Sequence, residues 1–204
     1  MSHTARYLTE VVALAQALDA AAIEALAQEL RQVRERAGRV FVLGVGGSAA
    51  NASHLVNDLR KLCDIEAYTP TDNVAELTAR TNDDGWARSF VGWLEVSRLA
   101  ARDLLLVLSV GGGDAQRGVS PNLVAALELG QSRGARIGGI VGRDGGQTRR
   151  VAHACVLVPD LVPERVTPHT EAFQAVIAHL LVCHPDLQRA PAKWESQTEG
   201  GKSP

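Results

Sequence analysis

The sequence predicts an α/β protein, a three-layer α-β-α sandwich with a mostly parallel sheet, preceded by an N-terminal helix. Three observations lead to this prediction. Short apolar runs alternate with helix-like stretches along the chain, two of these runs end in glycine loops that lead into helices, and an amphipathic segment precedes the first run. Strands that alternate with helices are typical of parallel sheets covered on both faces.

The N-terminal segment has a helical pattern. Between residue 8 and about residue 36, apolar residues recur at spacings of three and four, which predicts one amphipathic helix or two helices joined near Asp19. Gly38 ends this segment. Its apolar face covers either the domain itself or another subunit, and we expect a homo-oligomer because no obvious strand lies beside it in the sequence.

Five apolar runs are expected to form the sheet, with helices between them. The expected strands are 40–43, 65–68, 104–108, 137–141 and 155–158. The helices expected after the first strand are 49–62, short pieces within 71–86, 87–100, 121–133, a short helix after GRDGG, and 167–182. Ser120 and Pro121 favour a helix start, since serine caps helices and proline suits the first helical position. Gly134 favours the end of that helix.

Composition indicates a globular protein and excludes several classes of partner. Hydrophobic residues make up 46% and charged residues 22% of the chain, and the net charge is −2 with both signs interspersed. Neither nucleic acid nor a membrane is therefore an expected partner, and the apolar runs are far shorter than a membrane span of about 18 residues. Three widely spaced cysteines and the lack of a signal-peptide pattern favour the cytoplasm. We expect one domain over residues 1–190 and a flexible tail over 191–204.

Two glycine loops, 44–48 and 109–113, each follow an apolar run and precede a helix. Glycines let backbone N–H groups approach an anion, and the helix end adds partial positive charge. Ser48 and Ser109 could each add a hydroxyl. A single such loop would be explained equally well as a tight turn, but two of them predict an anion site beyond the carboxyl ends of the strands.

The first loop is compatible with a dinucleotide. Gly44, Gly46 and Ala49 fit the G-x-G-x-x-A pattern, and Asp64 or Glu66 could serve as its acidic residue. A match this short is weak, and it leaves the next helix unexplained.

That helix carries His54 and Asp58 one turn apart on one face. A pyrophosphate needs no such pair, whereas chemistry on a small phosphorylated substrate does. Taken alone, His54 would be explained as a surface histidine and Asp58 as a solvated carboxylate.

The segment GVGGSAANASHLVNDL, residues 44–59, resembles the G-N-G-G-S-A…H-x-x-x-E-L segment of phosphoheptose isomerases, which have the sugar isomerase (SIS) fold. TDN…LTARTNDDGW resembles the family's segment that ends in Asn-Asp-x-Gly, and LSVGGG stands where the family has I-S-T-S-G-N-S. GRDGG is similar to its G-x-D-G-G, and the final helix to its Q-E-x-H…H helix. The resemblance covers roughly residues 5–184. It implies an aldose–ketose isomerase that converts sedoheptulose 7-phosphate to a heptose 7-phosphate, as a homotetramer and often with zinc.

By position, the resemblance implies four metal ligands: His54, Asp58, Glu171 and His179. Two nitrogens and two carboxylates suit zinc and are acceptable for other divalent ions. The resemblance also implies His179 as the catalytic base and Asp58 as the assisting acid–base group, with the metal as the electrophile.

The match on the last helix needs a shift of one residue. An ungapped alignment would place Thr170 and Ala178 at the functional positions, whereas Glu171 and His179 keep the family's eight-residue separation. Two departures remain: Asp58 reaches about 1.5 Å less far than the family's glutamate, and Glu171 adds a charge where the family has glutamine.

The phosphate loop departs from the family more strongly. It has fewer hydroxyl residues and is longer by about six residues, GDAQRG, in which Asp114 should repel a phosphate and an arginine could bind one. The expected phosphate contacts are Gly46, Gly47, Ser48, Ser109, Gly111, Arg117 and Ser120. Asp72 and Asn82 could bind sugar hydroxyls, or could equally be turn formers.

Two other functions stay open at this stage. A non-catalytic SIS module that binds a sugar phosphate or a protein partner would explain the altered phosphate loop and Asp58. A dinucleotide-dependent oxidoreductase would explain the glycine pattern of the first loop.

Overall fold

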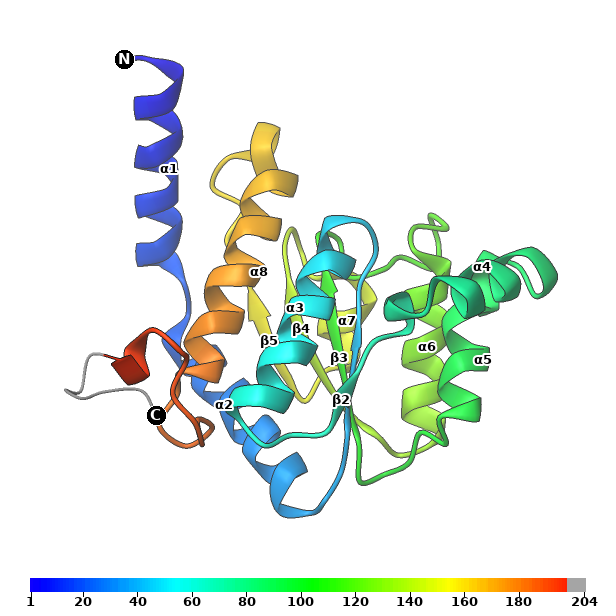
Figure 1. Cartoon of the computed structure of the whole chain (residues 1–204). Coiled ribbons are helices and arrows are strands. Elements are labelled where there is room, and N and C mark those ends of the chain that lie inside the picture. Colours follow the sequence, from blue (N-terminus) through cyan, green and yellow to red (C-terminus); the bar gives the residue numbers. More distant parts are fainter. Residues whose placement is uncertain (198–204) are drawn as a thin grey trace.

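The computed structural model describes residues 1–197, and in it a parallel sheet lies between two layers of helices (Figure 1). The strands are β1 Val40–Leu43, β2 Ala67–Tyr68, β3 Leu104–Ser109, β4 Arg136–Val141 and β5 Ala154–Leu157. Their order is β2-β1-β3-β4-β5, and every neighbouring pair is parallel. The predicted sandwich is confirmed, although β2 at the sheet edge is shorter than expected.

Helices fill the connections between the strands. The α-helices are α1 His3–Ala17, α2 Ala20–Glu35, α3 Gly47–Leu62, α4 Val74–Asp83, α5 Ser89–Val96, α6 Pro121–Ser132, α7 Gly146–Val151 and α8 Val166–Val182. Short 3-10 turns are η1 Pro70–Asp72, η2 Trp86–Arg88, η3 Pro163–Arg165 and η4 Glu195–Gln197. Within residues 1–197, no helix has the length and apolar character that crossing a membrane requires.

The two faces of the sheet bury two separate cores. In β1, Val40 and Val42 enter the core shared with α2, α3 and α8, whereas Phe41 and Leu43 enter the core shared with α5 and α6. Side chains of a strand alternate between faces, so a strand covered on both sides is apolar throughout. This explains why the strands are continuous apolar runs in the sequence. We call these the α3–α8 face and the α6 face.

The N-terminal segment forms two helices, which decides between the two alternatives left open by its sequence. Asp19 begins α2, because its Oδ1 accepts hydrogen bonds from the backbone N–H of Ala21 at 2.9 Å and of Ala22 at 3.2 Å. Most of α2 packs on the sheet. α1 buries only Leu14 and stands beside α8 (Figure 1).

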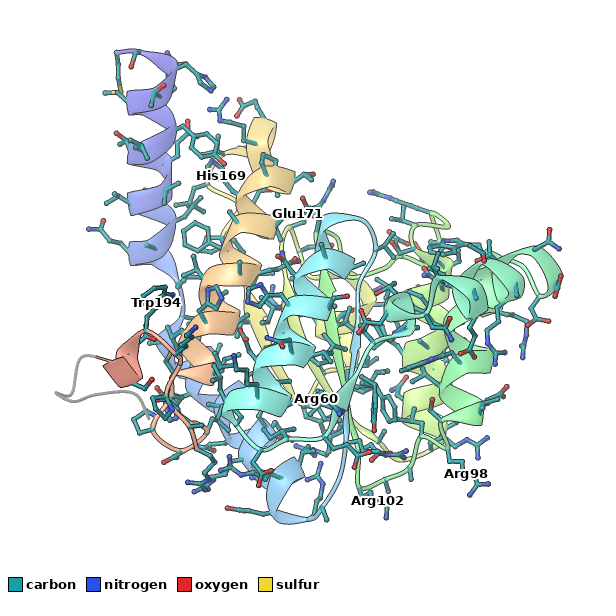
Figure 2. The ribbon with its side chains drawn as sticks, viewed as in Figure 1. Arg60, Arg98, Arg102, His169, Glu171 and Trp194 are labelled. Atoms are coloured by element: carbon teal, nitrogen blue, oxygen red, sulfur yellow. The ribbon has the colours of Figure 1, made fainter. Side chains whose placement is uncertain are left out.

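A charged cluster attaches α1 to α8, with His169 lying between the two helices (Figure 2). Glu10 of α1 accepts hydrogen bonds from Arg165 at 2.6 and 2.8 Å, and its Oε2 lies 3.0 Å from Nε2 of His169. The ring of Tyr7 stacks on His169, with 4.6 Å between centroids. Hydrogen bonds from Arg165, and then from His169, lower the pKa of Glu10 to about 2.

Ser120 precedes α6 as expected, but it does not cap the helix. Its φ is 50°, in the left-handed region, and its side chain makes no cap hydrogen bond. A capping serine needs extended backbone angles, so this geometry turns the hydroxyl away from the first N–H groups of the helix. Pro121 does occupy the start of α6. Of the expected tail, residues 191–197 include η4, and residues 198–204 lie outside the described residues.

A buried carboxylate joins the amino ends of β1 and β3. Asp103 is fully buried and accepts hydrogen bonds from the backbone N–H of Arg39 and of Ala100. The Arg39 guanidinium donates to both carboxylate oxygens, at 3.2 and 2.8 Å. Each lone-pair direction of the carboxylate therefore meets a donor, which is the condition for a tolerated buried charge.

We expect Asp103→Ala to lower the free energy of unfolding by about 3–5 kcal/mol, because it leaves buried donors unpaired. Urea denaturation monitored by circular dichroism measures this change. As a control, Asp84→Ala removes a half-exposed carboxylate that forms an ion pair with Arg80 at 3.9 Å. This variant should lower the free energy of unfolding by less than about 1 kcal/mol. Similar losses in both variants would contradict the assignment.

The charged cluster predicts a pH-dependent attachment of α1. Because the pKa of Glu10 is lowered in the folded chain, its stabilisation is present above the ordinary value of 4.5 and is lost as pH falls towards 2. We expect amide protection factors in α1 to fall over this range, and Glu10→Gln to lower them at pH 7. Glu24→Gln on α2, where the carboxylate contacts His184 and not α1, should leave them unchanged.

Candidate metal and catalytic site

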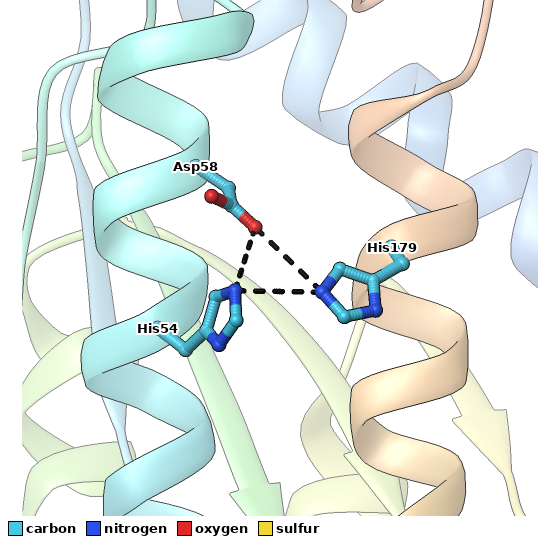
Figure 3. A group of neighbouring side chains, drawn as sticks. All are labelled: His54, Asp58 and His179. Atoms are coloured by element: carbon cyan, nitrogen blue, oxygen red, sulfur yellow. Dashed lines mark hydrogen bonds and ion pairs between the residues drawn. The ribbon is translucent and has the colours of Figure 1, made fainter. Parts of the chain in front are cut away.

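Three side chains that are far apart in the sequence meet between α3 and α8 (Figure 3). Nε2 of His54 lies 3.1 Å from Oδ2 of Asp58 and 3.4 Å from Nε2 of His179. Nε2 of His179 lies 3.9 Å from the same Asp58 oxygen. One possible ligand atom from each residue falls within 4.8 Å of the others. The group therefore presents two imidazole nitrogens and a carboxylate oxygen to one point.

Polar contacts set how α3 and α8 lie against each other. Asn51, one turn before His54 on α3, donates through Nδ2 to the backbone carbonyl of Glu171 at 2.8 Å and to Oε1 of Gln174 at 3.1 Å. Gln174 is fully buried, so this contact is shielded from water. The amide of Asn51 thus links both helices close to the three-residue group.

The exposure of the group leaves room for a ligand. The side chains of His54 and His179 are 59% and 55% exposed, whereas that of Asp58 is 13% exposed. Asn57 donates to the other carboxylate oxygen of Asp58, at 2.9 Å, which holds the carboxylate in place. Two histidines and a carboxylate with one open side are a typical ligand set for catalytic zinc. The same groups, within reach of one another, can exchange a proton with a bound molecule.

Glu171 does not join this group. Its carboxylate lies against Gly47, and a Cβ on Gly47 would come within 2.5 Å of Oε2 of Glu171. Figure 2 shows Glu171 between α8 and the start of α3. Eight residues along a helix span about 12 Å, which separates Glu171 from His179. The expected four-ligand set is therefore brought together only in part, with three of its members in contact.

The last helix places His179, and not Ala178, opposite α3. Ala178 is buried in the core of the α3–α8 face. Thr170, the other residue of the ungapped alignment, is also buried. Its Oγ1 lies against Gly142, in the space that a Cβ on that residue would need. The geometry of α8 thus agrees with the one-residue shift at His179.

The two glycine loops lie at the carboxyl edge of the sheet, at the ends of β1 and β3. In the first, Gly46 has a φ of 63° and Ser48 is buried at the start of α3. In the second, Oγ of Ser109 accepts a hydrogen bond from the N–H of Gly112 at 3.0 Å. The Ser109 oxygen thus stabilises its own turn, and its hydroxyl hydrogen is left for another acceptor.

The remaining predicted contacts are dispersed. Asp72, the last residue of η1, accepts a hydrogen bond of 2.5 Å from Ser53 of α3, the neighbour of His54, and so lies against α3. Asn82 lies on exposed α4 and donates to Asp83. Gly111 and Arg117 line a cavity with residues of α7.

The positioning residues Asn51, Asn57 and Gln174 were not among the residues predicted from the sequence. The only local signal was that Asn51 lies one turn before His54 and therefore shares its helix face. The roles of Asn57 and Gln174 depend on contacts that spacing does not reveal.

Comparisons with known proteins relate the chain to one family. Residues 5–142 match the model of the SIS domain. A phosphoheptose isomerase from Citrifermentans bemidjiense is 32% identical over 180 residues, covering 84% of this chain and 86% of the relative. One from Geobacter sp. is 35% identical over 155 residues, covering 72% and 73%. The structure of phosphoheptose isomerase GmhA from Neisseria gonorrhoeae is similar with a TM-score of 0.76 and 22% identity, covering 88% of this chain and 94% of that one.

We expect the three-residue group to bind zinc, and His54→Ala to weaken binding by about 100-fold or more because it removes one of few ligands. A competition titration against a chromogenic chelator measures this. His184→Ala is the matched control, since His184 contacts Glu24 outside the group. Equal zinc affinity of His54→Ala and the unmodified chain would refute the metal site.

Proposed function

We propose that this chain, which belongs to the SIS-domain family and is a phosphosugar isomerase like its phosphoheptose isomerase relatives, interconverts sedoheptulose 7-phosphate and a heptose 7-phosphate. The observation that carries this proposal is the convergence of His54, Asp58 and His179 on one solvent-open point. The names of the relatives support the choice of substrate.

The proposed chemistry moves a proton between adjacent carbons through an enediol, which needs a base, a proton donor for the oxygens, and stabilisation of the developing oxyanion. We assign the base to His179, whose exposed imidazole faces the open side of the group. Asp58 moves the proton at the sugar oxygens, because its Oδ2 lies near both imidazoles. His54 holds the carboxylate from the same helix face.

A divalent ion fits the donor set, and zinc is our proposal. His54, Asp58 and His179 would hold it before substrate binds, since their ligand atoms already lie within 4.8 Å of one another. To act as the base, His179 would have to leave the ion, because a coordinated nitrogen has no free lone pair. When bound, such an ion polarises the carbonyl and hydroxyl oxygens of the sugar. Glu171, implied as a fourth ligand, has its carboxylate beside Gly47 and contributes negative charge to the start of α3.

The phosphate is proposed to bind at the carboxyl edge of the sheet. The supporting groups are the glycine turn before α3, where the space beside Gly46 is open, and the hydroxyls of Ser48, Ser109 and Ser120. Asp72, held against α3 by its hydrogen bond from Ser53, is proposed to accept a hydrogen bond from a sugar hydroxyl.

We also propose a homotetramer in the cytoplasm. Apolar side chains remain exposed on α1, at Leu8 and Val12, and on α8, at Val176 and Leu180. The two on α8 lie within one helical turn of His179. Burying such side chains against other copies would shield them and enclose the open side of the site.

We expect His179→Ala and Asp58→Asn to lower kcat by about 10²–10⁴-fold, because each removes a proton-transfer group. Turnover of sedoheptulose 7-phosphate by zinc-loaded protein, followed by NMR, measures this. His184→Ala serves as the control and should retain activity within about twofold.

A chain that binds sedoheptulose 7-phosphate without converting it would favour the non-catalytic module instead. Full activity in both His179→Ala and Asp58→Asn would contradict the assigned roles.

A further inference from the structure

The start of α3 has no cap from its own sequence. Gly46, the residue before the helix, has a φ of 63° and a ψ of −128°, and no side chain makes a cap hydrogen bond there. The first turn of α3 also contains no acidic residue. The first N–H groups of a helix lack partners inside the helix and carry partial positive charge, so this end of α3 attracts negative charge from elsewhere.

Glu171 of α8 places its carboxylate at this end of α3. A Cβ on Gly47, the first residue of α3, would lie 2.5 Å from Oε2 and 2.7 Å from Oε1 of Glu171. The backbone of Glu171 is fixed against the same helix, because its carbonyl accepts a hydrogen bond of 2.8 Å from Nδ2 of Asn51, one turn after Gly47. The chain therefore supplies its own negative charge to a helix start that lacks one.

Gly47 leaves the space that this carboxylate occupies. Its φ is not positive and it lies within α3, so its backbone does not require glycine, and alanine is the better helix former. The three heavy atoms nearest to a Cβ on Gly47 all belong to the Glu171 carboxylate. Glycine at 47 and glutamate at 171 thus fit each other, at a position where the family pattern has a neutral glutamine.

The carboxylate is placed so that it can leave. Within residues 1–197 it makes no hydrogen bond or ion pair, and Glu171 is only half-buried. A Cβ on Gly46 would meet no atom within 4 Å, so the turn beside the carboxylate is open to a ligand. Attraction to a helix end is weak where water is close, and a phosphate dianion is attracted more strongly than a single carboxylate.

We propose that Glu171 is an internal competitor for the anionic group of the ligand: its carboxylate occupies the start of α3 in the free chain and moves away when a phosphate binds there. This role rests on the proposed function, in which the phosphate binds at the glycine turn before α3. The affinity for phosphate is then lower than the turn alone would provide, because binding must displace a group of like charge.

A calorimetric titration of the full chain with inorganic phosphate tests the competition. Glu171→Gln keeps the shape of the side chain and removes its charge, so we expect phosphate to bind about tenfold more tightly than to the unmodified chain. Glu164→Gln is the matched control, because it removes an exposed carboxylate of η3. Its phosphate affinity should stay within about twofold of that of the unmodified chain.

Thermal unfolding tests the position of the carboxylate. Gly47→Ala fills the space beside α3 and pushes the carboxylate away, which the flexible end of Glu171 allows. We expect Glu171→Gln to lower Tm by about 1–4 °C in the unmodified chain, because it removes the negative charge from the helix start. In the Gly47→Ala background the same change should lower Tm by less than half as much, because the carboxylate has already left α3.

Equal or weaker phosphate affinity in Glu171→Gln, or no phosphate binding to either chain, would overturn the proposal. Equal Tm shifts in the two backgrounds would overturn it as well, since the carboxylate would then not act at Gly47. Neither measurement uses turnover. A chain that fails to convert sedoheptulose 7-phosphate would therefore refute the isomerase reaction without changing either result.

Discussion

The packing of α3 against α8 is the constraint on which the chemistry of this chain depends. His54 and Asp58 are on one helix and His179 is on the other, and neither helix alone carries three ligands. The register between them is set by apolar contacts beneath the group and by the amide of Asn51, which reaches two acceptors on α8. A rotation of α8 by one residue, about 100°, would replace His179 by Ala178 or Leu180 at this point.

Asp58 shows how a shorter side chain can still serve the site. The Asp58 carboxylate lies 3.1 Å from Nε2 of His54 and accepts a hydrogen bond from Asn57. The shorter side chain therefore still contacts the histidine on its own helix. The distance from the same carboxylate to His179 is longer, 3.9 Å.

Charge is distributed over the molecule in three different ways. Asp103 is fully buried, and its hydrogen bonds serve the sheet. Glu10 joins two helices at a partly buried contact with Arg165 and His169. Arg117 and Arg143 lie largely unpaired around an open cavity. The first arrangement stabilises the fold, the second positions a helix, and the third leaves guanidinium groups exposed to solvent.

Local pattern alone determined the strands, most helix bounds and the pairing of His54 with Asp58, because strand alternation and the 3.6-residue helical repeat follow from backbone geometry. The family resemblance, and not the local pattern, implied Glu171 and His179 as members of one ligand set. Only the tertiary structure separated them, placing Glu171 at Gly47 and His179 at His54, about two helical turns apart. It likewise brought Arg117, Arg143 and Arg150 to one cavity. Contacts between distant segments are decided by the sum of many small packing terms, and no single stretch of sequence contains that sum.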